Sequence, residues 1–251
     1  ALRAGVKHIA LTASFIAIGY SDTALSRPYT PADWSTVGGP GNNAYGDSKT
    51  LAEQKAWQIM EDAGARERLT TVNPVLVLGP VLNGDLSTST DIIAKMMRGE
   101  FPAAPKIHIP LVDVRDVADF HVAALTKGEN CRRYVAGGEN CVVQELGKTV
   151  TRLTGRKPMH IPTGRGMTLF SARIVEGFCK LFGLTPPFTY DLIYEVLERW
   201  GFYDFQDSID TFGFTPRKSE ESLKSAINWL LETDKIKPSI AQDVRNKLAQ
   251  S

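Results

Sequence analysis

The chain has 251 residues, of which 43% are hydrophobic and 23% charged, and its 29 basic and 28 acidic residues leave a net charge of +1. These values are typical of a globular protein and argue against the basic stripe of a nucleic-acid-binding protein. No apolar run reaches the roughly 18–20 residues that span a bilayer. The cysteines at 131, 141 and 179 form no C-x-x-C pair, which argues against a disulfide framework or a zinc site and favours a reducing, cytoplasmic compartment.

Strands and helices are predicted to alternate in the first 136 residues. A strand over 6–12 precedes a loop over 20–43, a helix runs from 44 to about Gly64, and a strand over 69–73 is broken by Pro74. A helix over 91–98, a strand over 107–112, a helix over 117–126 and a strand over 133–136 follow. Such alternation predicts a parallel sheet and an α/β fold. The helix from 44 is predicted to carry one apolar stripe, formed by Ala52, Ala56, Ile59, Met60 and Ala63.

The remainder reads as mostly helical. Helices are predicted over 142–153, 167–184 and 191–199 and from Ser219 onward, with a short strand over 201–205. In the helix over 167–184, helical spacing of the apolar residues predicts a half-buried helix. Asp113 and Asp116 are interpreted as helix caps. The four histidines show no metal-ligand spacing, so no metal site is predicted.

The stretch "AYGDSKTLAE" over 44–53 carries the strongest chemical signal. Tyr45 and Lys49 lie four residues apart on a predicted helix, so the ammonium can approach the phenol. A nearby positive charge favours the phenolate, and a tyrosine tuned in this way can exchange a proton with an alcohol or carbonyl oxygen. Ser14 follows the first strand, where ligands bind in open parallel sheets. Its hydroxyl could hold the same oxygen.

With these residues the chain resembles the extended short-chain dehydrogenase/reductases of the NAD-dependent epimerase/dehydratase superfamily, in particular the dihydroflavonol-4-reductase-like branch. "LTASFIA" resembles that family's serine-bearing strand end, although Ala13 stands where a serine is common. "YGDSKTLAEQKAW" resembles its tyrosine–lysine helix, and "NPVLVLGP" resembles its nicotinamide loop. Blocks at 87–125 and 212–230 match as well, and the similarity is weakest over 155–210.

The resemblance implies a Rossmann-type parallel sheet with a smaller, mostly helical substrate domain, and an enzyme that interconverts a carbonyl and an alcohol with NADP or NAD. Tyr45 would be the general acid/base, Ser14 would orient the carbonyl, and Lys49 would assist Tyr45 and bind the nicotinamide ribose. The cofactor would also contact the residues Pro74, Leu76, Val77 and Ser89, the last in a polar loop with Ser87. We expect residues 1–82 to belong to the dinucleotide-binding domain and 83–251 to the substrate region, with 107–136 returning to the former.

One element of that family is missing from the sequence. No glycine-rich phosphate-binding turn precedes Ser14, although such enzymes hold the pyrophosphate on one. We therefore interpret the chain as N-terminally truncated. Two alternatives stay open, a sugar-nucleotide epimerase or dehydratase of the same superfamily and a non-catalytic fragment. The substrate would be a small molecule, with a homodimer as one option for the assembly.

Overall fold

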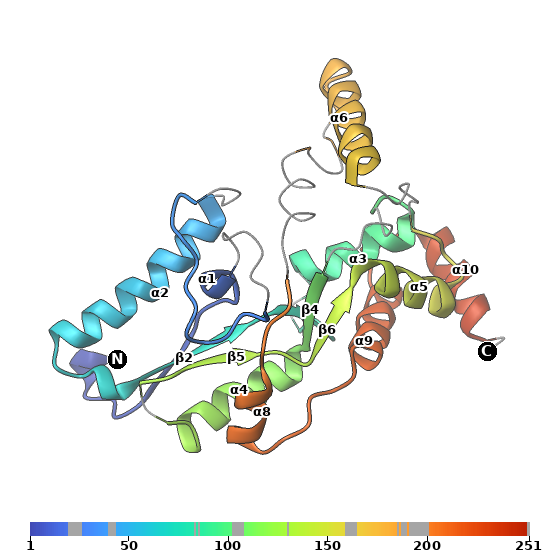
Figure 1. The fold of residues 1–251 in the computed structure, drawn as a ribbon. Coiled ribbons are helices and arrows are strands. Elements are labelled where there is room, and N and C mark those ends of the chain that lie inside the picture. Colours follow the sequence, from blue (N-terminus) through green and yellow to red (C-terminus); the bar gives the residue numbers. More distant parts are fainter. Residues whose placement is uncertain are drawn as a thin grey trace. The chain divides into compact units, whose positions relative to one another are not determined.

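The structure is a computed structural model, which describes residues 1–19, 27–39, 44–82, 84, 86–101, 108–129, 131–158, 165–184, 186, 190 and 201–249. Its elements are shown in Figure 1. In chain order they are η1 (Leu2–Ala4), β1 (Ile9–Thr12), α1 (Ile16–Gly19), α2 (Ala44–Asp62), η2 (Arg66–Arg68), β2 (Leu69–Pro74), β3 (Leu76–Leu78), α3 (Thr88–Arg98), β4 (His108–Asp113), α4 (Val114–Thr126), β5 (Arg133–Ala136), β6 (Glu139–Val142), α5 (Val143–Thr154), α6 (Arg165–Leu181), α8 (Gln206–Phe212), α9 (Ser219–Glu232) and α10 (Pro238–Leu248).

A parallel sheet organises the first part of the chain. Its order is β1-β2-β5, with Thr12 paired to Val72 and Val72 to Tyr134. A second sheet has the order β3-β4-β6. The predicted α/β class with a parallel sheet is therefore confirmed. The strand β2 runs through Pro74, which pairs with Ala136, so the expected break comes one residue later than predicted.

The sheet β1-β2-β5 separates two helices, and the alternation of side chains along each strand decides which helix each residue meets. Leu69, with Ile9 and Leu11 of β1, packs against Trp57 and Met60 of α2. The opposite face belongs to α4, where Val72 and Tyr134 join Phe120 in the main core.

Aromatic contacts fill the core on the α4 face. The Phe120 ring lies 4.6 Å from the Phe214 ring and 5.7 Å from the Phe212 ring, and Phe212 lies 4.6 Å from Tyr134. Phe120 and Tyr134 have no measurable solvent exposure. These rings join α4 and α8 to β5, so the segment over 206–214 belongs to the same core as the early strands.

The described chain divides into two compact units. Unit 1 comprises Ala1–Val77, Pro110–Asn140 and Trp200–Lys218, and unit 2 comprises Leu78–Ile109, Cys141–Arg199 and Ser219–Ser251. Within unit 2 the helix α5 contacts α3, α9 and α10. The assignment of a dinucleotide-binding and a substrate domain to 1–82 and 83–251 stays a prediction.

Several element boundaries differ from those predicted. The helix α3 begins at Thr88 because Ser87, rather than Thr90 or Asp91, is its N-cap and accepts from the Thr90 backbone N–H at 3.2 Å. The helix α4 begins three residues early, at Val114. The strand β6 and the helix α10 were not predicted, and the expected strand over 201–205 is reduced to one bridge between Tyr29 and Tyr203. The predicted helix over 191–199 lies outside the described residues.

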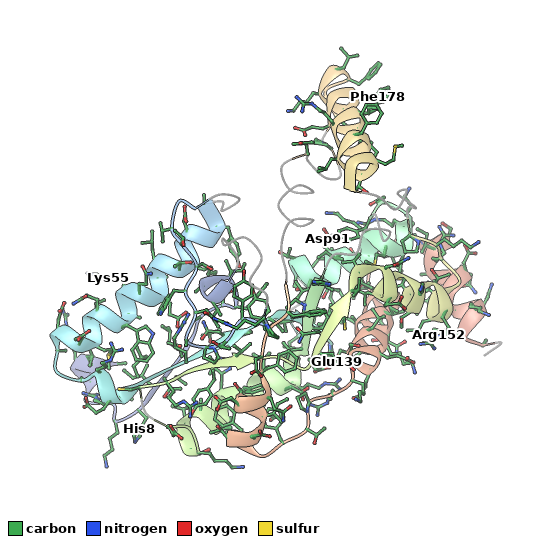
Figure 2. The ribbon with its side chains drawn as sticks, in the orientation of Figure 1. His8, Lys55, Asp91, Glu139, Arg152 and Phe178 are labelled. Carbon is green, nitrogen blue, oxygen red and sulfur yellow. The ribbon has the colours of Figure 1, made fainter. Side chains whose placement is uncertain are left out.

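The helix α6 was predicted to be half-buried, and that prediction is wrong for its apolar stripe. Phe170, Ile174 and Phe178 are each more than half exposed, and Phe178 is labelled in Figure 2. The inward residues are the smaller Thr168, Ala172 and Cys179. Across the described residues, no helix combines the length and the apolar character needed to cross a membrane.

A charged turn closes the loop that leads to α2. The Asp33 carboxylate accepts two hydrogen bonds of 2.7 Å from Arg27 and one each from the Thr30 backbone N–H and hydroxyl. The hydrogen bonds from Arg27, with those from Thr30, lower the pKa of Asp33 from its usual 3.8 to about 2. The ionised carboxylate is therefore the form that stabilises this loop.

Asp33→Asn is expected to lower the free energy of unfolding by about 1–2 kcal/mol at pH 7, a value reduced because Arg27 is half exposed. The folded-state pKa lies below the unfolded one, so this stabilisation is present above pH 3.8 and is lost as the pH falls towards 2. Urea denaturation at pH 7 and near pH 2 measures both. The exposed Asp243→Asn is the control. If Asp33→Asn lowered the free energy of unfolding equally at pH 7 and near pH 2, the stabilising role of the ionised Asp33 carboxylate would be contradicted.

Candidate active site

The first two turns of α2 present Tyr45 and Lys49 together. Gly46 and Thr50 are buried on the inner side of these turns. Tyr45 therefore points outward and is 58% exposed. The Lys49 ammonium lies 5.5 Å from the centre of the Tyr45 ring. The i,i+4 spacing thus brings the two side chains together as predicted from the helix geometry.

Ser14 lies directly after β1, at the start of α1. Its side chain is nearly buried, and its Oγ accepts a hydrogen bond of 3.3 Å from the Ile16 backbone N–H. A hydroxyl has one donor and two acceptor sites, so this bond leaves the Ser14 proton available for a second partner. The Ser14 backbone carbonyl accepts a 3.0 Å hydrogen bond from the Asn73 side-chain amide.

Parallel pairing continues past the end of β1 and brings the Ser14 segment against the end of β2. Ala13 N–H donates to the Val72 carbonyl at 2.8 Å, and Phe15 N–H donates to the Pro74 carbonyl at 3.1 Å. The helix α1 then packs against α2. Unit 1 therefore gathers Ser14, the Tyr45 helix and Pro74 around the carboxyl ends of its strands, where ligands bind in open parallel sheets.

The other predicted cofactor residues are placed differently. Leu76 and Val77 lie half-buried in β3, directly after β2. Ser89 is buried in the first turn of α3 rather than in the polar loop that was predicted, whereas Ser87 ends that loop as the N-cap of the helix. Because α3 belongs to unit 2, the cofactor role of Ser89 stays a prediction, as do the roles of the other site residues.

A charged cluster between α2 and the sheet was not predicted from the sequence. Glu53 of α2 is 1% exposed and pairs with Arg133 of β5 at 2.8 Å. Of the apolar stripe predicted on α2, Met60 is buried but Ile59 is 47% exposed, and the buried face is formed by Gly46, Thr50, Glu53, Trp57 and Met60. The sequence does contain a signal for this burial, because Glu53 is the one charged residue on a helical face that is otherwise small or apolar.

The two carboxylates interpreted as caps have different roles. Asp113 is the N-cap of α4 and accepts from the Arg115 backbone N–H at 2.9 Å. Asp116 is no cap, because it lies inside the helix and binds the Arg217 backbone N–H at 2.7 Å and the Arg217 guanidinium. It therefore holds the segment before α9. Among the described residues, no cluster of three or more His, Cys, Asp or Glu side chains could hold a metal ion.

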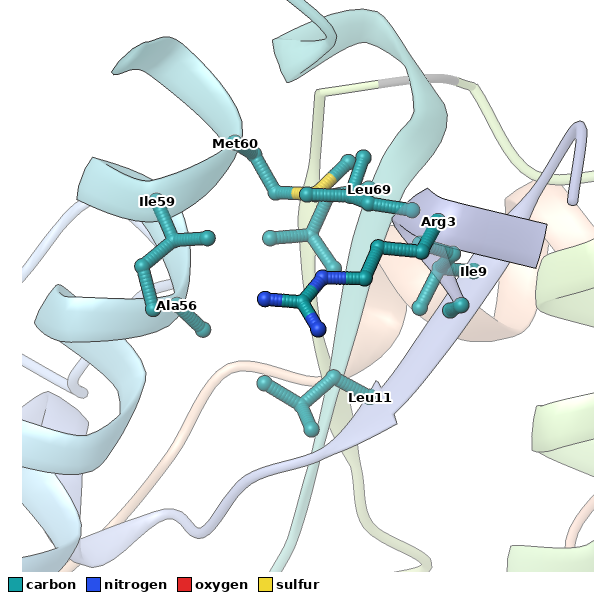
Figure 3. Close-up of a pocket in the computed structure, with 9 residues that line it drawn as sticks. Arg3, Ile9, Leu11, Ala56, Ile59, Met60 and Leu69 are labelled. Carbon is teal, nitrogen blue, oxygen red and sulfur yellow. The ribbon is translucent and has the colours of Figure 1, made fainter. Parts of the chain in front are cut away.

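A pocket of about 390 Å³ lies at the far end of α2 (Figure 3). It is lined by Arg3, by Ile9 and Leu11 of β1, and by Ile59 and Met60 of α2, among others. At 1.5 Å per residue, Met60 lies roughly 20 Å along the helix from Tyr45. The lining of this pocket is mostly apolar and includes none of the predicted site residues.

Curated relatives of this chain include several reductases, while no family model matches it. It is 32% identical over 149 residues to cinnamoyl-CoA reductase CAD2 of Medicago truncatula, which covers 56% of the chain and 42% of that protein. It is 31% identical over 159 residues to NADPH-dependent methylglyoxal reductase GRE2 of Saccharomyces cerevisiae, covering 56% and 44%. A putative dihydroflavonol 4-reductase of Synechocystis is 25% identical over 235 residues, covering 91% and 66%. The chain thus spans less than half the length of the first two relatives.

Solved structures share the fold. A nucleoside-diphosphate-sugar epimerase from Pseudomonas aeruginosa has a TM-score of 0.73 at 19% identity, covering 94% of this chain and 70% of that one. Vestitone reductase from alfalfa, Medicago sativa, has a TM-score of 0.64 at 18% identity, covering 92% and 66%. At these identities the likeness concerns the fold alone. Together with the reductase relatives, it confirms the resemblance to the extended short-chain dehydrogenase/reductases, including their dihydroflavonol-4-reductase-like branch.

Proposed function

We propose that the protein containing this chain reduces the carbonyl group of a small molecule to an alcohol, or catalyses the reverse reaction, with NADPH or NADH as the hydride donor. The observation that carries the proposal is the exposed Tyr45 phenol beside the Lys49 ammonium. This pair lies in the unit that holds Ser14 at the carboxyl end of a parallel strand.

Each of the three residues has a chemical role in the proposal. Tyr45 donates a proton to the carbonyl oxygen as the carbon receives the hydride, and removes that proton in the reverse direction. Lys49 stabilises the phenolate that Tyr45 becomes. Ser14 donates its free hydroxyl proton to the same oxygen and so polarises the carbonyl. Proton and hydride together account for the two hydrogens added across the double bond.

The chemistry of the available groups fits the nicotinamide end of the proposed cofactor. The cofactor, when bound, supplies the hydride, and the protein supplies position and electrostatics. Lys49 and Tyr45 would hold the ribose next to the nicotinamide. Pro74, Leu76 and Val77 would line the ring, because Pro74 ends β2, the strand next to Ser14, and Leu76 and Val77 come directly after that strand. Ser89 is the remaining proposed contact.

We prefer a reductase to a sugar-nucleotide epimerase because named reductases are among the relatives above 30% identity, whereas the likeness to the epimerase is one of fold. The test uses the longest natural protein that contains this chain. We expect it to oxidise NADPH in the presence of aldehydes, ketones or dihydroflavonols. Epimerisation of a sugar nucleotide without net NADPH oxidation would instead support the alternative, and absence of both activities and of NADPH binding would support a non-catalytic chain.

The proposed compartment is the reducing cytosol. The side chains of Cys131, Cys141 and Cys179 form no disulfide, and Cys131 is exposed. Exposed free cysteines persist in reducing surroundings.

Light scattering on the same preparation distinguishes a monomer from the homodimer that the resemblance leaves open.

A further inference from the structure

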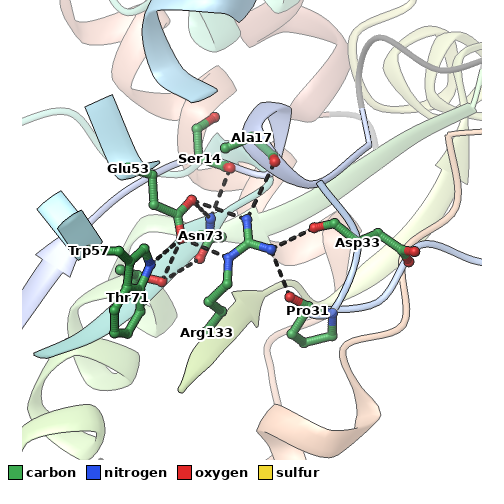
Figure 4. Close-up of polar contacts among 9 residues, drawn as sticks. All are labelled: Ser14, Ala17, Pro31, Asp33, Glu53, Trp57, Thr71, Asn73 and Arg133. Atoms are coloured by element: carbon green, nitrogen blue, oxygen red, sulfur yellow. Dashed lines mark hydrogen bonds and ion pairs between the residues drawn. The ribbon is translucent and has the colours of Figure 1, made fainter. Parts of the chain in front are cut away.

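A charged pair lies buried between α2 and the sheet of unit 1 (Figure 4). The Glu53 carboxylate has no exposed side-chain surface, and the Arg133 side chain is 9% exposed. Arg133 Nε donates to Glu53 Oε1 at 2.8 Å, and Nη2 donates to Oε2 at 3.2 Å. Thr71 donates a further 2.8 Å bond to Oε1. The carboxylate is therefore bonded from both β2 and β5.

The guanidinium uses its remaining donors on backbone carbonyls. Nη1 donates to Pro31 and Asp33, and Nη2 donates to Ala17 at 3.4 Å. Its face covers the Trp34 ring, with 3.6 Å between the guanidinium carbon and the ring centre. Arg133 thus joins β5, α1, and the loop that leads to α2. A buried ion pair gives little net stability compared with apolar packing, so a geometric role better explains so many directed contacts.

Asn73 connects this pair to the serine. Its side-chain nitrogen donates one hydrogen to Glu53 Oε2 at 2.7 Å and the other to the Ser14 carbonyl at 3.0 Å. A carboxylate can only accept hydrogen bonds. Glu53 therefore holds the amide with its nitrogen towards both oxygens, and a flipped amide would place oxygen against oxygen. The Thr71 hydroxyl, 3.2 Å from the Asn73 amide oxygen, favours the same orientation. Glu53 therefore helps to set the Asn73 amide and, with it, the Ser14 backbone contact.

The same carboxylate belongs to the helix of the proposed acid. Glu53 follows Lys49 by one helical turn and Tyr45 by about two. We propose that Glu53, Asn73 and Arg133 are positioning residues that set Tyr45 and Lys49 relative to Ser14. The inference rests on the proposed function. Glu53 fixes the helix, Asn73 fixes the serine, and Arg133 holds the carboxylate that serves both.

Glu53→Gln keeps the shape of the side chain but replaces one acceptor oxygen with an NH2 group, which must face a donor of either Asn73 or Arg133. In the first orientation the Asn73 amide loses a bond or turns away from Ser14, and in the second Arg133 loses its bond to position 53, so either one disturbs the network. We expect kcat to fall at least about tenfold with KM changed less than about twofold, because misplacement of reacting groups affects the transition state most. Phe120→Leu is the control. It loosens the core on the opposite face of the sheet, so it is expected to lower the unfolding midpoint and to keep kcat.

The exchanged pair Glu53→Gln with Asn73→Asp separates positioning from stability. The introduced glutamine on α2 can donate to the introduced aspartate on β2, so the link between helix and strand is restored and a negative charge stays near Arg133. The aspartate, however, has no N–H to give to the Ser14 carbonyl. We therefore expect the double variant to regain stability relative to Glu53→Gln while kcat stays at least about tenfold below wild type. Recovery of kcat along with stability would show that the network only supports the fold.

Asn73→Ala gives a second route to the answer if the exchanged pair folds poorly. It leaves Glu53 and Arg133 paired and removes the side-chain bond to Ser14. A kcat as high as that of Phe120→Leu would overturn the inference. Tyr45→Phe is measured alongside. If it retains turnover, the proposed function fails, whereas an inactive Tyr45→Phe with a fully active Asn73→Ala refutes the positioning role alone.

Discussion

Tyr45→Phe is expected to lower kcat by about 10²–10⁴-fold, the usual contribution of a general acid or base. The substitution removes only the hydroxyl of a side chain that is 58% exposed. Folding is therefore expected to change little. Steady-state kinetics on the longest natural protein containing the chain, with an accepted carbonyl substrate, measures the effect.

Tyr134→Phe is the matched control for that experiment. Its hydroxyl accepts a 2.8 Å bond from the Glu129 backbone N–H and lies on the α4 side of the sheet. Loss of this bond is expected to lower the free energy of unfolding by about 1 kcal/mol and to leave kcat unchanged. Full turnover in Tyr45→Phe would remove the catalytic assignment.

Arg133→Met is expected to have the largest effect on stability. It leaves the Glu53 carboxylate buried without its cation, and three backbone carbonyls lose their donor. Removing one partner of a buried ion pair costs about 3–5 kcal/mol. Chemical denaturation followed by circular dichroism measures this loss.

Arg152→Met makes the same replacement at a pair that is exposed. Arg152, labelled in Figure 2, binds Glu220 at 2.6 Å with both side chains at least 41% exposed. Exposed ion pairs contribute little to stability, so this variant is expected to unfold close to wild type. Equal losses in the two variants would show that the buried cluster has no special weight in the fold.

Local patterns predicted the elements around the proposed site. Strand-to-helix alternation predicted the parallel sheet, and the i,i+4 spacing of Tyr45 and Lys49 predicted their proximity. These features depend on residues near one another in the sequence, where backbone geometry alone determines which side chains meet. The segment around Ser14 could be placed for the same reason, since it follows a strand whose apolar run is short and clear.

The charged cluster could not be predicted in this way. Glu53 can be buried because Thr71, Asn73 and Arg133 donate hydrogen bonds to its carboxylate. These partners lie 18, 20 and 80 residues further along the chain, so local sequence patterns do not reveal them. Without those partners a carboxylate on a helix is expected in solvent. The predicted apolar stripe of α2 therefore only partly matches the buried face, which also includes Glu53. The predicted half-burial of the apolar residues of α6 was wrong for a related reason. Periodicity identifies an apolar face of a helix but not the part of the protein that covers it.

The central claim is that hydride passes to a carbonyl carbon while Tyr45 supplies the proton. The most direct test gives the longest natural protein containing this chain NADPH that carries deuterium at the transferring position, with a carbonyl substrate that it accepts. Mass spectrometry of the alcohol is expected to find deuterium on the former carbonyl carbon, with the rate of its appearance strongly reduced in Tyr45→Phe. An alcohol without deuterium at that carbon, or equal rates in both proteins, would contradict the account.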